Sequence, residues 1–253
     1  MKALLALLIT LLCSTPGAAF TLCVESADYP PFIHARGEIE QAGLLPQMVQ
    51  QAALANGTRV ELLRQPWKRC IDNVRTGKVD ALLALIWSPE RDEWVAFPKR
   101  PERPRDAPDS ELRVWREEYR IFVPLQGTLR YDGKRFEGLR TGIGAPTGYV
   151  VWQRLKDAGV LSESVLKPQI GLRLVAMGRL DGYVSERSIG LHLLRSMGLR
   201  DQVALLPQVY HQDDSYLVFS HAFRRSQPQL TQAIWQSLRG IRERHAAQLR
   251  LDE

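Results

Sequence analysis

The segment from residue 21 to residue 86 alternates between strand-like and helix-like patterns, and this alternation restricts the fold more than any other feature of the chain. The five expected elements are a strand at Thr21 to Glu25, a helix from about Leu45 to Asn56, a strand at Arg59 to Leu63, a helix at Pro66 to Thr76 and a buried strand at Val79 to Ile86. Strands alternating with helices predict an α/β sheet. Such a sheet binds ligands beyond the carboxyl ends of its strands, where Tyr29 and the Trp87 to Arg91 segment would lie.

A second run of the same kind follows a break between Pro98 and Ser110, where Pro, Arg, Glu and Asp predict a loop or linker. Its expected elements are strands at Tyr119 to Val123, Leu139 to Ile143 and Gly182 to Ser185, and helices at Tyr149 to Ala158, before Gly178 and at Glu186 to Met197. A strand at Tyr216 to Phe219 and an amphipathic helix at Gln229 to Leu249 close the chain. At 253 residues, two compact lobes fit the length as well as one domain does.

The first 19 residues have the order of a secretory signal peptide. Lys2 gives the positive start, Ala3 to Leu12 is an apolar run too short to span a bilayer, and small residues precede Phe20. A buried N-terminal helix is the alternative. Cys13 does not fit a lipoprotein signal, because the residue before it is Leu12. We therefore expect cleavage before Phe20, export to the periplasm and no membrane span in the mature chain.

Charge and motif content exclude several function classes. The 34 Lys and Arg against 28 Asp and Glu give a net charge of +6, too small for a dedicated nucleic-acid-binding protein. The five histidines show no close pair at metal-ligand spacing, so we expect neither a metal site nor a bound cofactor. No G-x-S-x-G elbow is present. The segment His211 to Asp214 is interpreted as a polar connection between elements.

Two cysteines remain after the expected cleavage, Cys23 and Cys70. In an oxidising compartment an even pair predicts a disulfide. Two separate buried thiols remain the alternative at this point, because the sequence does not show that the two Cα atoms are close enough.

The loop from Gly142 to Gly148 lies between an expected strand and an expected helix. Its glycine spacing and Pro146 do not fit a dinucleotide-binding loop. Free N–H groups at a helix start attract anions, and the hydroxyl of Thr147 could add a hydrogen bond. Thr147 as a simple helix N-cap is the alternative.

Several short strings, taken in order, resemble one family. These are the export signal, Ala27 to Phe32 (ADYPPF), Pro66 to Cys70 (PWKRC), Gly77 to Ala81 (GKVDA), Ser88 to Arg91 (SPER) and Gly178 to Tyr183 (GRLDGY). The chain is similar over nearly its whole mature length to the family 3 bacterial extracellular solute-binding proteins. The resemblance implies a two-lobed, type II periplasmic binding protein-like α/β fold. Lobe 1 would comprise residues 20–117 and 210–253, and lobe 2 residues 118–209, with a hinge that the chain crosses twice.

The resemblance also implies the ligand site. Arg91 would bind the α-carboxylate of an amino acid with a bidentate fork, and Glu186 would face its α-ammonium. Thr147 and nearby N–H groups would meet the carboxylate from the other lobe. The site would be walled by three aromatic side chains, those of Tyr29, Phe32 and Trp87.

The function implied is that of a non-catalytic periplasmic receptor. It would be a monomer that binds a polar, amino-acid-like solute by cleft closure and delivers it to the permease of an ABC importer. Two alternatives remain. Periplasmic cyclohexadienyl dehydratases are similar in fold to this family, and Glu186 could act as a general acid if burial raised its pKa. A sensory or accessory binding module is the other.

Overall fold

The computed structural model of the chain describes residues 19–100, 102–103, 105–162 and 167–251. The expected signal peptide lies outside the described residues except for Ala19, so its cleavage stays a prediction. Within the described part, no helix has the length and apolar character needed to cross a membrane.

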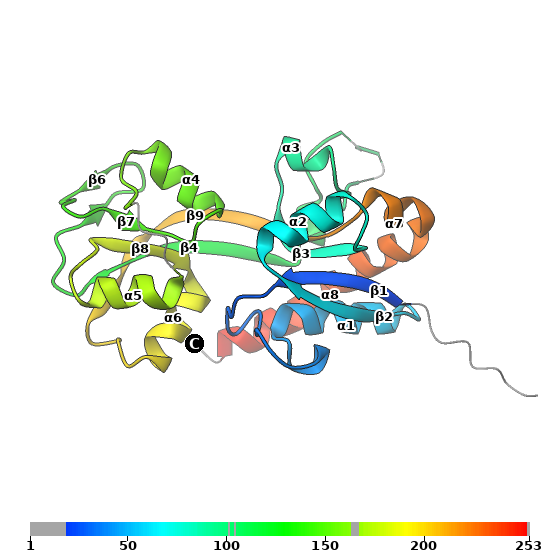
Figure 1. Cartoon of the computed structure of the whole chain (residues 1–253), viewed down its shortest axis with the longest axis horizontal. Coiled ribbons are helices and arrows are strands. Elements are labelled where there is room, and N and C mark those ends of the chain that lie inside the picture. Colours follow the sequence, from blue (N-terminus) through cyan, green and yellow to red (C-terminus); the bar gives the residue numbers. More distant parts are fainter. Residues whose placement is uncertain (1–18, 101, 104, 163–166, 252–253) are drawn as a thin grey trace, which may run out of the picture.

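One seven-stranded sheet runs through the molecule (Figure 1). Its strands, in sheet order, are β2 (Arg59–Gln65), β1 (Ala19–Glu25), β3 (Ala81–Ile86), β9 (Val203–Phe219), β4 (Trp115–Pro124), β8 (Gly182–Glu186) and β7 (Ile143–Gly144). The pairs β1–β2, β1–β3 and β7–β8 are parallel, whereas β3–β9, β9–β4 and β4–β8 are antiparallel. A short hairpin of β5 (Arg130–Tyr131) and β6 (Phe136–Glu137) lies apart from this sheet.

The helices gather in two groups, which form two lobes (Figure 1). Lobe 1 contains β1 to β3 with α1 (Leu44–Ala55), α2 (Trp67–Arg75), α3 (Pro89–Asp92), α7 (His221–Ser226), α8 (Pro228–Leu251) and the 3-10 turns η1 (Ile39–Gln41) and η2 (Ser110–Leu112). Lobe 2 contains β5 to β8 with α4 (Val150–Asp157), α5 (Pro168–Ala176) and α6 (Arg187–Ser196). The two α/β runs expected from the sequence are confirmed; the residue boundaries of the lobes stay a prediction.

Strands β4 and β9 run from one lobe into the other (Figure 1). They pair from Trp115 with Ser215 to Pro124 with Val203, and β9 continues along β3 as far as Phe219. The interpretation of His211 to Asp214 as a connection between elements is therefore wrong. Pairing with β4 satisfies the backbone of this polar segment, so it forms the middle of one 17-residue strand.

Alternating residues divide the core of lobe 1 between the two faces of its sheet. On β1, Leu22 packs in the cluster that contains α1 and α8, whereas Cys23 packs on the opposite face with α2. The predicted disulfide between Cys23 and Cys70 is confirmed, with Cα atoms 5.6 Å apart. It joins β1 to α2, so sheet and helix are covalently tied.

An irregularity in β3 breaks this alternation next to the cleft between the lobes. Ala84 has a positive φ of 63°, and the register with β9 shifts between Leu82 and Leu85. As a result Leu85 packs on the same face as Leu82. A bulge of this kind re-aims the residues that follow, here Ile86 and the segment that leads to Arg91.

Candidate functional site

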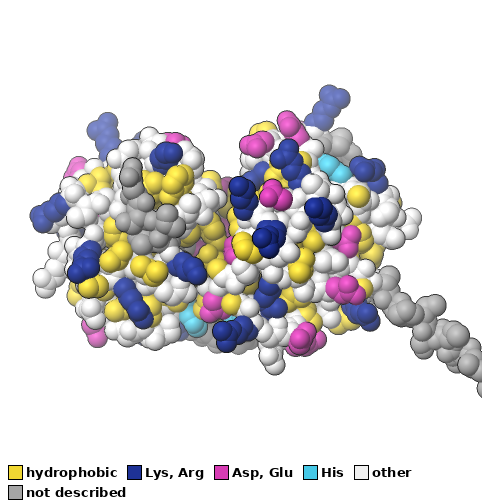
Figure 2. Space-filling model, in the orientation of Figure 1, with side chains coloured by type: hydrophobic (Ala, Val, Ile, Leu, Met, Phe, Trp, Pro, Cys, Tyr) yellow, Lys and Arg dark blue, Asp and Glu magenta, His cyan; other side chains and the backbone are white. Residues whose placement is uncertain are grey.

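A cleft lies between the two lobes and is lined by both. Figure 2 shows the lobes as separate masses with a hollow between them. The cleft takes in about 900 Å³ of space, open solvent at its mouth included. Its charged and aromatic lining comprises Glu25, Tyr29, Phe32, Trp67, Arg91, Glu117, Tyr119, Tyr149 and Glu186. Aromatic walls with a few convergent charges are typical of small-molecule sites.

Arg91 enters the cleft from α3, a single helical turn that the sequence encodes clearly. Ser88 is the N-cap, and its hydroxyl accepts a hydrogen bond from the Arg91 backbone N–H at 3.2 Å, with Pro89 at the start of the turn. The guanidinium Nη1 donates to the Ile86 carbonyl at 2.7 Å. Burial lowers the pKa of Arg91, an effect opposed by Glu90 and other acidic neighbours. Within the described residues no carboxylate lies within 4.0 Å of this guanidinium.

Glu186 enters the cleft from lobe 2. It is the last residue of β8 and the N-cap of α6, where its Oε2 accepts a hydrogen bond from the Ile189 N–H at 2.9 Å. The side chain is buried, and this burial raises the pKa of its carboxyl well above the usual value; the charge of Glu117 raises it further. The backbone N–H groups at the helix start oppose both effects.

Glu117 is a second carboxyl in the cleft, and sequence reasoning did not select it. It lies on β4, close to the crossing between the lobes, and its Oε1 accepts a hydrogen bond from the Ser215 hydroxyl at 2.9 Å. Burial raises the pKa of Glu117 to about 7; the Ser215 hydrogen bond lowers it and Asp213 raises it. The only sequence signal is its place in a charged stretch, Arg116 to Arg120, which resembles an ordinary exposed part of a strand.

Two tyrosines meet across the cleft. Tyr29 of lobe 1 and Tyr149 of lobe 2 have ring centroids 6.2 Å apart. Burial raises the pKa of Tyr29, and the nearby Tyr149 hydroxyl partly offsets this. A second contact joins the lobes nearby, because the Gln169 Nε2 donates to the Asp28 carbonyl at 3.5 Å. The two lobes therefore touch beside the cleft.

Four of the six residues predicted to bind the ligand line the cleft: Tyr29, Phe32, Arg91 and Glu186. Their roles in binding stay predictions.

The other two, Trp87 and Thr147, are not part of the lining. Trp87 packs instead against the cluster between the sheet and α2, where its indole N–H is buried without a partner among the described groups. Thr147 is exposed, and its neighbours Pro146 and Gly148 line the cleft in its place. Thr147 is also not an N-cap, because Tyr149 holds that position before α4.

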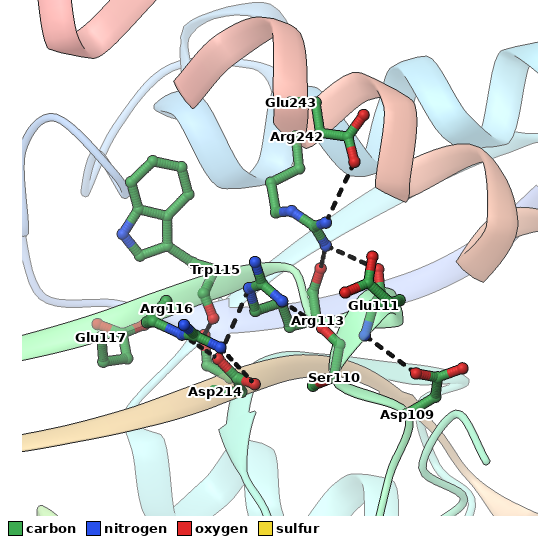
Figure 3. Close-up of polar contacts among 11 residues, drawn as sticks. Asp109, Ser110, Glu111, Arg113, Trp115, Arg116, Glu117, Asp214, Arg242 and Glu243 are labelled. Atoms are coloured by element: carbon green, nitrogen blue, oxygen red, sulfur yellow. Dashed lines mark hydrogen bonds and ion pairs between the residues drawn. The ribbon is translucent and has the colours of Figure 1, made fainter. Parts of the chain in front are cut away.

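The lobe 1 end of the hinge is held by a cluster of charged groups (Figure 3). Asp214 of β9 lies 2.8 Å from Arg116 Nε and 3.6 Å from Arg113 Nε. The buried Arg242 of α8 donates to the carbonyls of Glu111 and Arg113 at 2.9 and 2.6 Å. These contacts fix the start of β4 to lobe 1, so bending is expected beyond them, towards lobe 2.

No cluster of metal-ligating side chains is found among the residues that the structure describes. The cleft offers a ligand one guanidinium, three carboxyl groups and several tyrosine side chains.

Comparison with known structures finds the same fold in proteins of low sequence identity. The sensor domain of a histidine kinase with similarity to periplasmic binding proteins has a TM-score of 0.69 at 17% identity, covering 91% of this chain and 93% of that one. The GluR0 ligand-binding core from Nostoc punctiforme, in complex with L-glutamate, has a TM-score of 0.67 at 15% identity, covering 90% and 95%. An ancestral amino-acid-binding protein, a precursor of cyclohexadienyl dehydratase, has a TM-score of 0.66 at 16% identity, covering 90% and 93%. At such identities these likenesses show the fold alone.

Comparison with curated protein sequences finds no match. The model of one protein family, however, matches residues 22–249, which is almost the whole described chain. This match agrees with the two lobes, the crossing strands and the cleft between them. The chain belongs to the bacterial extracellular solute-binding proteins, family 3.

Proposed function

We propose that this protein is a periplasmic receptor that binds an amino acid or a close relative between its lobes and delivers it to the permease of an ABC importer. One observation carries the proposal: the Arg91 guanidinium of lobe 1 and the Glu186 carboxyl of lobe 2 line the same cleft. These two groups complement the carboxylate and the ammonium of a zwitterion, whose ammonium favours the ionised form of Glu186. The family assignment supports a solute-binding role.

Closure of the lobes follows from the same arrangement. Arg91 offers a fork of N–H donors that fits a carboxylate in a bidentate manner. Glu186 lies on the other lobe, so a zwitterion reaches both groups only when the lobes are together. A ligand shifts the balance between open and closed forms by its difference in affinity for them, and a ligand held by one lobe alone would bind without closing the cleft.

Export and partner choice are part of the proposal. The signal-like residues 1–19 would be removed before Phe20, and the mature chain would act as a periplasmic monomer without a cofactor. N-terminal sequencing of the exported protein tests the cleavage site: a chain that begins at Met1 would contradict it. Uptake of labelled ligand by vesicles that contain the permease, with and without this protein, tests delivery.

Replacement of the charge anchor tests the binding mode. In Arg91→Ala we expect amino-acid binding, measured by calorimetry, to weaken by roughly 2 to 5 kcal/mol, as when one partner of a buried charged hydrogen bond is removed. Arg69→Ala is the matched control, because Arg69 is exposed on α2 outside the cleft lining. A ligand that binds Arg91→Ala as tightly as the unaltered protein would contradict the charge-anchor model.

A second candidate function has one observation in its favour. The Glu186 carboxyl is buried in the cleft with a pKa well above its usual value, a state suited to a general acid. A cyclohexadienyl dehydratase-like enzyme would use such a group. Incubation of the purified protein with prephenate or arogenate distinguishes the two functions: turnover that is lost in Glu186→Gln would establish the enzyme, and binding without turnover would support the receptor.

A further inference from the structure

The cleft contains more acidic groups than a zwitterion requires. Three carboxyl side chains, those of Glu25, Glu117 and Glu186, line it together with the single guanidinium of Arg91. Glu25 is occupied by the fold, because its Oε1 accepts from the Ala27 N–H at 2.9 Å and its Oε2 accepts from the Trp67 N–H at the start of α2, also at 2.9 Å. Two carboxyl groups are therefore left for a ligand.

These two carboxyl groups lie on adjacent strands. Tyr119 of β4 is the register partner of Glu186 of β8, and Glu117 is two residues before Tyr119 on the same strand. The charge of Glu117 contributes to the raised pKa of Glu186. One oxygen of each accepts a protein hydrogen bond, from Ser215 to Glu117 Oε1 and from Ile189 to Glu186 Oε2. In the described part of the chain, no Lys, Arg or His nitrogen lies within 4.0 Å of either carboxylate.

A zwitterionic ligand neutralises only one of the two. Its carboxylate would meet Arg91 and its α-ammonium Glu186, which leaves Glu117 in a closed, water-poor cleft. An ionised group without a partner is strongly disfavoured there. Either Glu117 keeps a proton, or the ligand brings a second positive charge.

We propose that Glu117 determines specificity, and that the ligand is an amino acid with a cationic side chain whose second positive charge lies at Glu117. This inference rests on the proposed function and names its ligand class. The cation replaces the proton that the carboxyl otherwise carries. The closed complex then has two positive charges facing two carboxylates, and the ligand carboxylate faces Arg91.

The pH response separates this arrangement from its alternative. Glu117 has a pKa of about 7, so a cationic ligand competes with a proton near neutral pH. The ionisable groups around Glu117 are Asp213 and His211 on β9, Glu186 on β8, Tyr119 on β4 and Arg91 on α3. Within this set His211 contacts Asp213. If the ligand carries a second positive charge, its binding should become tighter as pH rises through 7. If instead a protonated Glu117 donates a hydrogen bond to a neutral ligand, binding should become weaker over the same pH range.

Calorimetry with four probes tests the inference: L-arginine, L-lysine, L-glutamine and L-glutamate. We expect arginine or lysine to bind at least about tenfold more tightly than glutamine at about pH 8, and this preference to shrink at about pH 6, where Glu117 is protonated. Binding of the cationic probe should release protons, seen as a dependence of the measured heat on the buffer. In Glu117→Gln the preference should fall to less than about threefold.

Glu118→Gln is the matched control. Glu118 is the next residue on the same strand, outside the cleft lining, and its carboxylate pairs with Arg120 at 2.9 Å. The Glu118→Gln variant should keep the preference for cationic probes unchanged. Glu117→Asp, which keeps the charge, should retain part of the preference and shows that the position tolerates substitution.

Each outcome has a distinct meaning. If glutamine binds as tightly as arginine and lysine, or if the cationic preference survives in Glu117→Gln, the specificity inference is wrong and the receptor function stands. If binding of the cationic probe weakens as pH rises, Glu117 acts as a donor and the inference is again wrong. If none of the four probes binds at either pH, the proposed amino-acid function itself is overturned.

Discussion

Lobe 1 ties its sheet to a helix covalently, whereas lobe 2 holds its helices by close contact between glycines and aromatic rings. The disulfide between Cys23 and Cys70 joins β1 to α2. In lobe 2, a Cβ added to Gly190 of α6 would lie only 1.9 Å from the Phe122 ring, and one added to Gly171 of α5 only 2.1 Å from the Tyr183 ring. Both devices hold a helix on the sheet. Only the second depends on shape alone, so lobe 2 should be the more sensitive to small changes in side-chain volume.

The cleft differs from the cores of the two lobes in charge. Apart from Glu25, whose carboxylate accepts backbone hydrogen bonds, its charged lining consists of the cation Arg91 of α3 and the acids Glu117 of β4 and Glu186 of β8. In the described residues, none of these three side chains has an oppositely charged partner within ion-pair distance. Charges left unpaired in a partly buried site lower the stability of the empty protein. The cleft is therefore suited to binding rather than to stability, in contrast to the cores of the two lobes.

Reduction of the disulfide should have the largest effect on stability, and it tests the contrast between the two lobes. The bond closes a loop with a sequence separation of 47 residues. For such a loop the chain-entropy model gives about 4 kcal/mol of stabilisation. We expect urea unfolding of the reduced protein to shift by about this amount. Reductant should leave a Cys23→Ala, Cys70→Ala double variant unaffected, and an equal midpoint with and without reductant in the unaltered protein would contradict the prediction.

Replacing Glu117 tests the contrast between the cleft and the cores of the lobes. Its folded pKa of about 7 is above the usual value of 4.5, so the folded state holds this proton more tightly than the unfolded state. Glu117 therefore makes its full contribution to the free energy of unfolding below about pH 4.5. This contribution falls by on the order of 3 kcal/mol as pH rises to about 7. We expect ligand-free Glu117→Gln to melt roughly 6 °C or more above the unaltered protein at about pH 8.

At about pH 5 the two proteins should melt at similar temperatures, because the Glu117 carboxyl is then mostly protonated in the folded state. A variant less stable at both pH values would show that Glu117 stabilises the fold, and would remove the contrast between the cleft and the cores.

Alanine at position 190 tests how far lobe 2 depends on shape. The new methyl group would meet the rigid Phe122 ring on β4, and overpacking of this kind costs about 1 to 3 kcal/mol. Gly240→Ala in α8 of lobe 1 is the matched control, because its nearest neighbour would be the flexible end of Arg244 at 3.7 Å. There we expect a gain of about 0.5 to 1 kcal/mol from helix propensity. Equal effects in denaturant unfolding at both positions would contradict the contrast.

Local signals predict most of the fold. Gly57 and Gly77 end the first two helices where expected, and both have positive φ values near 71°. Ser88 and Pro89 encode the turn that carries Arg91. The sequence did not reveal the full length of β9, because residues 211 to 214 are polar and their pairing with β4 depends on the packing of both lobes. Glycines 171 and 190 were missed for the same reason: nothing local shows that a ring lies above them.

The site divides in a similar way. Residues in short family-like strings, such as Arg91 and Tyr29, reach the cleft. Trp87 is carried to another face after the irregularity at Ala84, which no local pattern indicates. Glu117 escaped notice because its partial burial arises only when β9 pairs with β4 and the lobes enclose the cleft. Burial of a charged residue on a crossing strand is a property of the assembled lobes.

Removing the contact between Tyr29 and Tyr149 should have the smallest effect, and it tests closure of the lobes most directly. The hydroxyls of Tyr29 and Tyr149 interact across the cleft, and Tyr149→Phe removes this interaction while keeping the ring. A polar interaction of this kind contributes about 1 kcal/mol, which corresponds to about a fivefold change in the ratio of closed to open forms. We expect a larger radius of gyration in small-angle scattering without ligand, and ligand affinity weaker by up to about fivefold. Tyr131→Phe is the control, because the Tyr131 hydroxyl donates to the Gly133 carbonyl at 2.9 Å within lobe 2 and crosses no cleft. If both variants behave alike, the tyrosine pair does not hold the lobes together, and closure depends on the ligand charges alone.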